Sequence, residues 1–435
     1  MLKYLDAIAE FKKKGSSKHL SERPNLSIFS EVFQAQEGVK SPYLVLDEVT
    51  AIKNTRSLTF AAVRELRETA DTCVMLTGSP LDNTWMDTYS YLQLVLGHDI
   101  RSRRTMLDLF ASRTLTGKPR PPIGNNFRRI LQLLNSFVFR RPEDILGIPP
   151  LDEQTFGFTL DSVNASKSDS HFSKYQLIVN INSKDAVQST NDPSNGSWKH
   201  LTLAMQYSMH PYLTLIMHLV RKAESHRAAD DPASADQLYE ARDIEDWGAW
   251  RDKLKLDDAW KSSRINAIID VLNKCRDLDP ECGVLIFEES VYFLDIVQVA
   301  LESMYDPIQC LRFDGREAPD KRNNVLREFQ MASGAKVLLI SRAAGGVGLN
   351  ITAANVVIIC GPWWKREWEV QAIKRAHRPG QTRRVLAIRI GAKNCAIETY
   401  KAGVRDKKHR HNSKIVHQIT RNDGEVPTVW TNLWA

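Results

Sequence analysis

Two pairs of residues in this sequence have the types and the spacing that phosphate chemistry requires. Asp47 and Glu48 are adjacent carboxylates, which are costly to fold unless a cation or a proton network uses them. Arg375 and Arg378 are three residues apart, so a helix would place both guanidinium groups on one face. Guanidinium groups suit a site where phosphate charge develops. Taken alone, the carboxylates also fit a plain turn and the arginines a solvated helix end.

Short apolar runs precede both pairs and predict the elements that position them. Residues 43–46 lead directly into the carboxylates, while residues 337–340 and 356–360 flank a glycine-rich segment, 343–350, ahead of the arginines. Uninterrupted apolar runs are typical of parallel strands that are buried on both faces. Because open α/β sheets place ligands at the carboxyl ends of their strands, we expect the chemistry there.

The segment 336–381 resembles motifs V and VI of the Swi/Snf-like family of DNA translocases, a branch of superfamily-two helicases. The family pattern is S-T-x-A-G-G-x-G-x-N-L-T-A-A, then D-x-x-W-N-P, then Q-A-x-x-R-A-x-R-x-G-Q. The matching residues are Ser341, Ala344, Gly345, Gly346, Gly348, Asn350, Thr352, Ala353, Ala354, Trp364, Gln371, Ala372, Arg375, Ala376, Arg378, Gly380 and Gln381. Three positions depart from the pattern: Gly361 replaces Asp, Lys365 replaces Asn and Arg366 replaces Pro.

Other segments resemble further motifs of the same family. Residues 47–54 resemble motif II, with Thr50 where the family has His or Gln, and residues 76–83 resemble motif III. Residues 283–289 resemble motif IV, with Glu288 and Glu289 in place of Ser-Gln. Two acids beside a DNA path would repel phosphate, so we expect weaker DNA binding than is usual for the family.

The resemblance implies a role for each matched position. Asp47 would hold Mg²⁺ through water and Glu48 would orient the attacking water, while the γ-phosphate would meet Arg375 and Arg378. The expected nucleotide-binding residues are Gln371, Gly346 and Gly348, and the expected coupling residues are Thr77, Gly78 and Ser79. The expected DNA-binding residues are Ser341, Arg342, Gly345, Asn350, Thr352 and Trp364. For Trp364, a place in the core is an equally good interpretation.

The fold that the resemblance implies is α/β, with two RecA-like lobes of parallel sheet flanked by helices. The first lobe is expected to be incomplete, with a helical insertion between the lobes. We expect a partial ATP-binding lobe over residues 1–150, a bridging region over 151–261, a C-terminal helicase lobe over 262–410 and a tail over 411–435. The cofactors would be ATP and Mg²⁺, and hydrolysis would move the chain along duplex DNA.

Composition sets the broad class. The 435 residues are 43% hydrophobic and 26% charged, which is typical of a globular protein. The net charge of +7 is compatible with nucleic acid. No apolar run is of membrane-spanning length, and the six cysteines lack zinc-type spacing, so reduced thiols and no membrane partner are expected. By resemblance, the partners would be duplex DNA and nucleosomes or other DNA-bound proteins, in the nucleus, for chromatin remodelling or DNA repair. The oligomeric state stays open.

The pattern GxxxxGK[ST] of a phosphate-binding loop is absent from the 435 residues. We therefore expect either a piece of a longer protein or a degenerate paralogue, and both an ATPase and a DNA- or protein-binding module stay open. This chain alone is expected to hydrolyse ATP poorly, because nothing evident would hold the β- and γ-phosphates in line.

Several local expectations complete the analysis. Residues 103–126, 161–170 and 183–195 read as loops, because they are rich in Pro, Ser, Asn or Asp. Residues 371–381 read as a helix. His210 precedes a proline and is expected to be a packing or capping histidine rather than a catalytic one.

Overall fold

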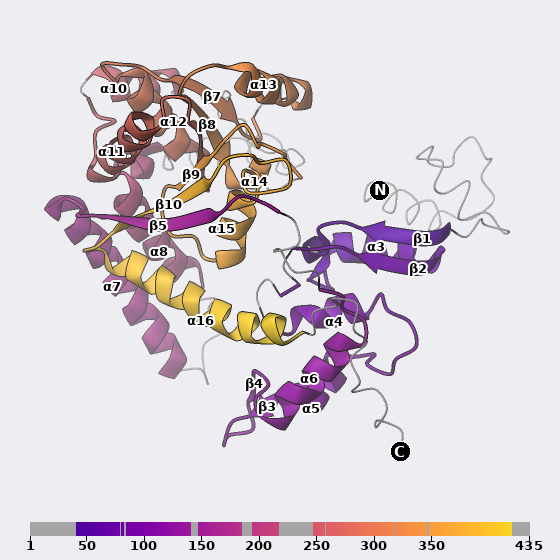
Figure 1. Ribbon diagram of the computed structural model, residues 1–435. Coiled ribbons are helices and arrows are strands. Elements are labelled where there is room, and N and C mark those ends of the chain that lie inside the picture. Colours follow the sequence, from indigo (N-terminus) through magenta and orange to yellow (C-terminus); the bar gives the residue numbers. More distant parts are fainter. Residues whose placement is uncertain are drawn as a thin grey trace, which may run out of the picture. The chain divides into compact units, whose positions relative to one another are not determined.

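The computed structural model describes residues 41–78, 80–81, 84–140, 147–184, 194–216, 247–256, 258–316, 318–345 and 348–419. The chain divides into two compact units (Figure 1). The first comprises Met1–Glu143 and Lys407–Ala435, and the second comprises Asp144–Asp406.

The second unit is built on a six-stranded parallel sheet of order β5-β10-β9-β6-β8-β7. The strands are β5 (Leu151–Phe158), β6 (Gly283–Glu288), β7 (Gln309–Phe313), β8 (Lys336–Ser341), β9 (Val356–Ile359) and β10 (Val385–Ala392). Every residue of β6, β8 and β9 is buried, as expected for central parallel strands.

The side chains of alternate residues in these strands pack into two hydrophobic cores, one on each face of the sheet. One core joins Val284 and Ile286 to α10 (Trp247–Leu256), α11 (Ser263–Leu278) and α12 (Val291–Glu302). The other joins Leu285 and Phe287 to α13 (Pro319–Met331) and α15 (Arg366–Ile373). The unit is therefore a three-layer RecA-like lobe, as the resemblance implies.

A helical hairpin and the first part of a long helix complete the second unit. The hairpin consists of α7 (Ser162–Lys184) and α8 (Ser194–Met209), and α16 (Ala396–Gln418) begins beside it. Phe172 of α7, Leu201 of α8 and Ile397 of α16 share one hydrophobic cluster.

The first unit contains the parallel pair β1 (Ser41–Leu46) and β2 (Ala70–Met75). Helices η2 (Val49–Ile52), α3 (Leu58–Glu68) and α4 (Asp87–Leu92) pack with this pair. A second cluster packs α5 (Arg103–Phe110) and α6 (Asn125–Asn135) with Ile415 and Ile419 near the end of the chain. A short hairpin, β3 (Ser112–Arg113) with β4 (Pro119–Arg120), joins α5 to α6.

The predicted strands form where expected. The runs 337–340 and 356–360 give β8 and β9, which lie on either side of β6 in one parallel sheet, and the run 43–46 lies in β1. The expectation that 43–46 is buried on both faces is wrong, because Tyr43 and Val45 are exposed. The sequence analysis missed β5, which pairs in parallel with β10 at the edge of this sheet.

The prediction of a loop over residues 103–126 is wrong in its first part, which forms α5. Ser102 caps this helix, since its Oγ accepts a hydrogen bond from the N–H of Thr105 at 3.0 Å. Met106 and Phe110 are buried on one side of the helix. Burial of these two side chains stabilises the helix despite the basic, proline-containing surroundings.

The prediction of a loop over residues 161–170 is also wrong, because α7 begins at Ser162. The Asp161 carboxylate accepts a hydrogen bond from the N–H of Asn164 at 2.9 Å, and Ser168 Oγ donates to the carbonyl of Ala204 in α8 at 2.8 Å. Packing against α8 thus overrides the low helix propensity of Ser, Asn and Asp. Of the third predicted loop, residues 185–193 lie outside the described residues.

Candidate functional site

In the first unit, the ends of β1 and β2 bring the motif II and motif III segments together. The N–H of Leu76 donates to the carbonyl of Leu46 at 2.8 Å, and the N–H of Val49 donates to the carbonyl of Leu76 at 3.1 Å. Because the strands are parallel, Asp47 and Thr77 leave the sheet at the same edge. The predicted catalytic and coupling segments are therefore neighbours.

Glu48 has a left-handed backbone, with φ 49° and ψ 48°. This conformation costs a non-glycine residue free energy and is often found at functional sites. The N–H of Glu48 donates to Oδ1 of Asp47 at 2.8 Å, and the Asp47 side chain is exposed. An exposed carboxylate at a strand end is a donor that suits hydrated Mg²⁺, which commonly takes its remaining ligands from nucleotide phosphates.

In the second unit, the carboxyl ends of β6, β8 and β9 form the corresponding edge. Glu288 pairs in register with Ser341, and the N–H of Cys360 donates to the carbonyl of Phe287 at 3.2 Å. Ser341 Oγ accepts from the N–H of Ala344 at 3.3 Å, at the start of α14 (Arg342–Gly345). The glycine-rich segment therefore begins at the place where such sheets bind ligands.

Arg342 lies at the centre of this edge. Its Nε donates to Oε1 of Glu289 at 3.0 Å, and its guanidinium lies 3.8 Å from the centroid of the Trp368 ring. The Lys365 ammonium lies 4.5 Å from the same ring centroid. Arg342 and Lys365 thus both make cation–π contacts with Trp368. The positive charge of Arg342 also offsets the negative charge of Glu289, one of the two acids expected to repel DNA.

A cavity of about 110 Å³ opens beside Arg342. Its walls are formed by Phe287, Arg342, Ala343, Gly345, Trp363, Trp368, Gln371 and Ala372. The cavity brings together Arg342 and Gly345, which the sequence assigns to DNA, with Gln371, which it assigns to nucleotide. Trp363, one of the lining residues, is buried, and its Nε1 has no hydrogen-bond partner among the described residues.

The second acid, Glu288, is fully buried. Burial and, after it, the charge of Glu289 raise the pKa of its carboxyl to about 7, against the opposing charges of Lys401 and Arg264. Burial also lowers the pKa of Lys401, although Glu289 and Glu288 oppose this. At neutral pH, Glu288 therefore carries only part of a negative charge. Glu288 should therefore repel DNA phosphate less than the sequence analysis expects.

The remaining predicted DNA-binding residues fall into two groups. Asn350 is exposed and Thr352 is half-buried in the loop after α14. Trp364 packs edge-on against Tyr400, with centroids 6.3 Å apart, and the Lys401 ammonium lies 5.1 Å from its ring centroid. Trp364 therefore joins the cluster of α7, α8 and α16, which favours its interpretation as a core residue.

Two of the predicted site residues, Ser79 and Gly346, lie outside the described part of the chain. Gly78 is exposed and Thr77 half-buried in the first unit. Gly348 is exposed and has φ 34°, a conformation that favours glycine.

The arginines of motif VI do not lie on one helix, contrary to the prediction. Helix α15 ends at Ile373, and Arg375 and Arg378 follow in a turn. Pro379 disfavours a helical backbone at the residue before it, and Gly380 has φ 96°, so a helix cannot continue through this segment. Arg375 is buried, whereas the half-buried Arg378 donates through Nη1 to the carbonyl of Leu349 at 2.7 Å.

Gln381 fastens this turn to the motif V loop, a role that the sequence analysis did not assign. Its Nε2 donates to the carbonyls of Thr352 at 3.2 Å, Ala354 at 2.8 Å and Ala376 at 3.1 Å. The N–H of Ile351 also donates to the carbonyl of Arg375 at 3.0 Å. The glycine-rich loop and the arginine turn are therefore held as one body.

Glu369 is a second residue that the sequence analysis missed. It is buried and accepts from Nη1 of Arg405 at 2.9 Å, Nε of Arg389 at 2.8 Å and Nη1 of Arg366 at 3.3 Å. Arg366 also bonds Glu153 of β5 at 2.7 Å. The departure from Pro at position 366 thus supplies an ion pair that ties α15 to the edge of the sheet.

Arg264 explains the departure at Gly361. This fully buried guanidinium donates through Nη1 to the carbonyl of Cys360 at 2.7 Å and pairs with Glu398. A Cβ at position 361 would lie 3.4 Å from Nη1 of Arg264 and 3.0 Å from Sδ of Met209. Glycine leaves the space that this arrangement needs.

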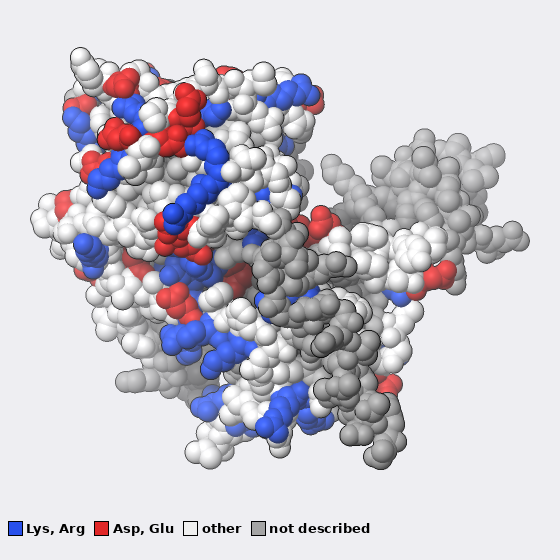
Figure 2. Space-filling view, viewed as in Figure 1, with Lys and Arg blue, Asp and Glu red and all other residues white. Residues whose placement is uncertain are grey.

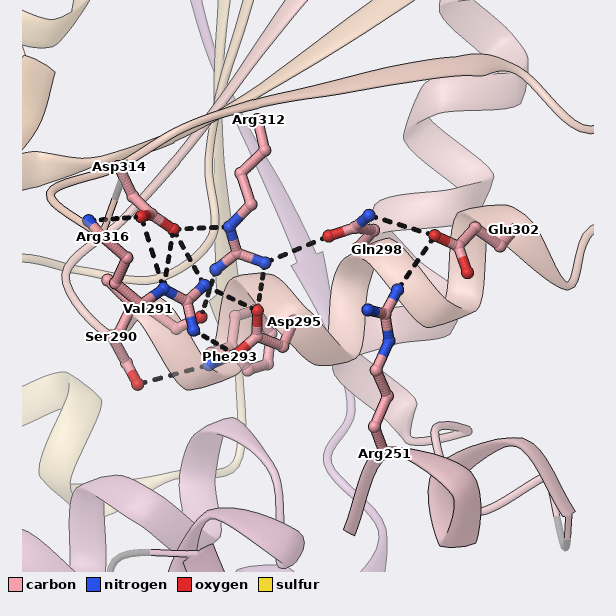
Figure 3. A network of polar contacts seen from close by, with 10 residues as sticks. All are labelled: Arg251, Ser290, Val291, Phe293, Asp295, Gln298, Glu302, Arg312, Asp314 and Arg316. Carbon is pink, nitrogen blue, oxygen red and sulfur yellow. Dashed lines mark hydrogen bonds and ion pairs between the residues drawn. The ribbon is translucent and has the colours of Figure 1, made fainter. Parts of the chain in front are cut away.

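An ion-pair network fixes the segment after β7 (Figure 3). Arg316 bonds Asp295 of α12 at 2.8 Å and Asp314 at 2.9 Å, and Arg312 donates to the carbonyl of Val291 at 2.8 Å. Burial alone would raise the pKa of Asp314, but its hydrogen bond with Arg316 and the charge of Arg312 lower it to about 2. Each of the four charged side chains, Asp295, Arg312, Asp314 and Arg316, is paired within the network, so we interpret it as structural.

The viewed face of the second unit carries acidic and basic side chains side by side (Figure 2). Among the described residues, no group of three or more His, Cys, Asp or Glu side chains could hold a metal ion. None of the described helices is long and apolar enough to cross a membrane.

Comparison with known proteins gives two matching family models. A model described as SNF2-related domain matches residues 26–213, and one described as helicase conserved C-terminal domain matches residues 263–380. The second of these covers most of the six-stranded sheet and ends at Gly380.

Curated relatives include bacterial and fungal proteins. An uncharacterized ATP-dependent helicase, MG018 of Mycoplasma genitalium, is 26% identical over 360 residues, covering 82% of this chain and 29% of the relative. DNA repair protein RAD5 of Yarrowia lipolytica is 38% identical over 168 residues, covering 38% of this chain and 16% of the relative. TATA-binding protein-associated factor mot1 of Schizosaccharomyces pombe is 26% identical over 392 residues, 86% of this chain and 20% of the relative.

The chain thus spans less than a third of the length of each of these relatives. Among solved structures, the C-terminal part of the Fun30 ATPase domain aligns with a TM-score of 0.44 and 20% identity. That alignment covers 62% of this chain and 99% of the other.

Proposed function

Because the chain belongs to the Swi/Snf-like family of superfamily-two helicase-related proteins, we propose that it binds duplex DNA and forms part of an ATP-dependent DNA translocase. The observation that supports this most strongly is the edge of the second unit. There, Arg342 and Gly345 line one cavity with Gln371, and the arginine turn is fastened to the loop that follows Gly345. DNA phosphates would meet Arg342 and the exposed Asn350.

In this proposal, the motif II carboxylates and the motif VI arginines act together in ATP hydrolysis. Asp47 would hold Mg²⁺ through water, Glu48 would orient the attacking water, and Arg375 and Arg378 would stabilise charge on the γ-phosphate. When bound, Mg²⁺ supplies neutralising charge to the phosphates. Positioning and fixed charge provide most of the rate in such transfers, so the left-handed backbone of Glu48 would matter by fixing its carboxylate.

A second candidate function is a DNA-binding module without appreciable ATPase activity. The observation that favours it is the absence of a GxxxxGK[ST] pattern from the 435 residues. Removal of a single preorganised donor commonly costs about a hundredfold or more in rate. A chain without a phosphate-binding loop would then still bind DNA but would hydrolyse ATP very slowly.

We propose the partners and the cellular location of this protein from its relatives. The names of the relatives include a DNA repair protein and a TATA-binding protein-associated factor. We therefore place DNA-bound proteins, nucleosomes included, among the partners, with chromatin remodelling or repair as the outcome. The relatives come from a mycoplasma as well as from fungi, so the family fits a bacterial as well as a nuclear location. The basic segment 405–414 fits a nuclear signal, a brace on DNA or a solvated tail equally well.

The test of DNA binding is fluorescence anisotropy of a labelled duplex with the full chain over a range of salt concentrations. We expect affinity to fall as salt rises, because phosphate contacts release counterions. Arg342→Ala should weaken binding and lower the salt slope by about one. The matched control is Arg327→Ala, an exposed arginine of α13 that should leave the slope unchanged.

Because Arg342→Ala also leaves Glu289 without its ion pair, the double variant Arg342→Ala, Glu289→Gln separates the two effects. It should recover part of the affinity while the slope stays reduced. Binding that does not depend on salt, or no binding at low salt, would contradict the proposal.

A further inference from the structure

The hairpin of α7 and α8 carries a pair of facing histidines that plays no part in the proposed function. His171 of α7 and His200 of α8 approach with their Nδ1 atoms 3.0 Å apart. Their ring centroids are 5.3 Å apart and the ring planes differ by 28°. Both side chains are half-buried, so solvent reaches the pair.

The surrounding helices hold His171 in place. The Tyr207 ring also stacks with His171, with ring centroids 5.8 Å apart and an angle of 6° between the planes. His171 therefore contacts two side chains of α8 that are two helical turns apart. Ser168, one turn earlier in α7, bonds the carbonyl of Ala204 at 2.8 Å, which fixes the spacing of the helices. Donors on packed helices are better preorganised than donors on loops.

We propose that His171 and His200 bind one exchangeable divalent transition-metal ion through their two Nδ1 atoms, with water as the remaining ligands. Metal–imidazole bonds are about 2.0–2.1 Å long, so nitrogens separated as these are would subtend about 94° at the ion. That angle is close to the right angle of tetragonal coordination and narrower than the tetrahedral angle that zinc prefers. Cu²⁺ and Ni²⁺ are the ions with this preference.

The two histidines have basic side chains around them. Lys167, whose ammonium lies 5.4 Å from the Tyr207 ring, Lys174 and Lys199 are the cationic neighbours. Their charge opposes any cation, so binding has to come from coordination by imidazole nitrogen, a ligand that suits Cu²⁺ and Ni²⁺ but not Mg²⁺. The pKa of His171 is lowered by burial first, and then by the charges of His200, Lys174 and Lys199.

Two protein ligands make an open site. Among the described residues, no third His, Cys, Asp or Glu completes a cluster here. Structural zinc sites use four protein ligands, whereas a two-ligand site keeps most positions for water and so exchanges its ion. Such an ion would link α7 to α8 only while it is present. The competing interpretation is a direct N–H···N hydrogen bond between two neutral rings.

The experiment is Cu²⁺ titration of the full 435-residue chain, followed by electron paramagnetic resonance and calorimetry. The first equivalent of Cu²⁺ should show couplings to two imidazole nitrogens. His171→Ala and His200→Ala should each show at most one at the same metal concentration, with affinity at least about tenfold weaker. The matched control is His417→Ala, an exposed histidine of α16, which should bind as the wild type does.

A hydrogen-bonded pair that binds no metal would give equal titrations for the wild type and both alanine variants, and that result would overturn the proposal. To separate loss of metal from loss of fold, His171→Asn keeps a polar side chain of similar size. Its circular dichroism without metal should match that of the wild type. If a folded His171→Asn chain still shows two-nitrogen coupling at the first equivalent, the site is elsewhere.

Discussion

Arg264→Ala should be among the most destabilising single substitutions in the second unit. The Arg264 guanidinium is fully buried and donates to the carbonyl of Ser208 through Nε and Nη2, both at 3.1 Å, and to that of Cys360 at 2.7 Å. It also pairs with Glu398, which is only 4% exposed. Alanine leaves that carboxylate buried with one remaining donor, the N–H of Ala392 at 2.9 Å.

The expected loss follows from this uncompensated charge. Removing one partner of a buried ion pair costs about 3–5 kcal/mol. For a unit of this size, each kcal/mol lowers Tm by roughly 2–4 °C, so a fall of about 6–20 °C is expected. The assay is urea and thermal unfolding of the full chain, followed by far-ultraviolet circular dichroism.

The matched control lies on the same helix. Arg276 of α11 pairs with Asp306, whose side chain is 74% exposed, and Arg276→Ala should cost less than about 1 kcal/mol. The double variant Arg264→Met, Glu398→Leu removes both charges and should recover much of the loss, because apolar replacements of a whole buried pair are often neutral. If Arg264→Ala lowers the free energy of unfolding no more than Arg276→Ala does, the buried Arg264–Glu398 pair is not important for stability and this reasoning is wrong.

Two further predictions test the packing of the second unit. His210 is buried, its Nε2 lies 3.2 Å from the carbonyl of Trp260, and burial lowers its pKa to about 4. Since the unfolded chain binds the proton at higher pH than the folded one, stability should fall as pH drops from about 6.5 to 4, by up to about 3 kcal/mol. His210→Gln should lose that part of the pH dependence in urea titrations, and an unchanged difference between pH 7 and 4.5 would contradict this. A Cβ at Gly283 would lie 2.4 Å from the carbonyl oxygen of Ala353, so Gly283→Ala should cost about 1–3 kcal/mol in the same assay. Gly391→Ala, in β10 with open space around it, is the control and should be near neutral; equal losses would refute the steric argument.

The central strands were predictable because their composition alone determines their environment. Residues 337–340 and 356–360 are apolar throughout, and only a sheet covered on both faces buries such runs. The position of Asp47 and Ser341 at strand ends followed from the same reasoning. The packing interpretation of His210, which bonds the backbone of Trp260 in a buried setting, is confirmed.

The missed features depend on contacts between distant parts of the chain. Helix α7 is rich in Ser and Asn, and its helical state depends on packing against α8 and α16. Glu369 and Arg264 are unremarkable in the sequence because their partners lie up to 134 residues away. Arg375 and Arg378 have helical spacing, yet Pro379 and the bonds of Gln381 turn the chain after Ile373.

The most direct test of the account is steady-state ATP turnover by the purified 435-residue chain, with and without duplex DNA, beside Glu48→Gln. The sequence retains the motif II carboxylates and the motif VI arginines but no GxxxxGK[ST] pattern, so we expect DNA binding with turnover far below about one per second, the low end of the usual enzyme range. Turnover at about that rate or faster, stimulated by DNA and abolished by Glu48→Gln, would show that another segment holds the phosphates and would contradict the account.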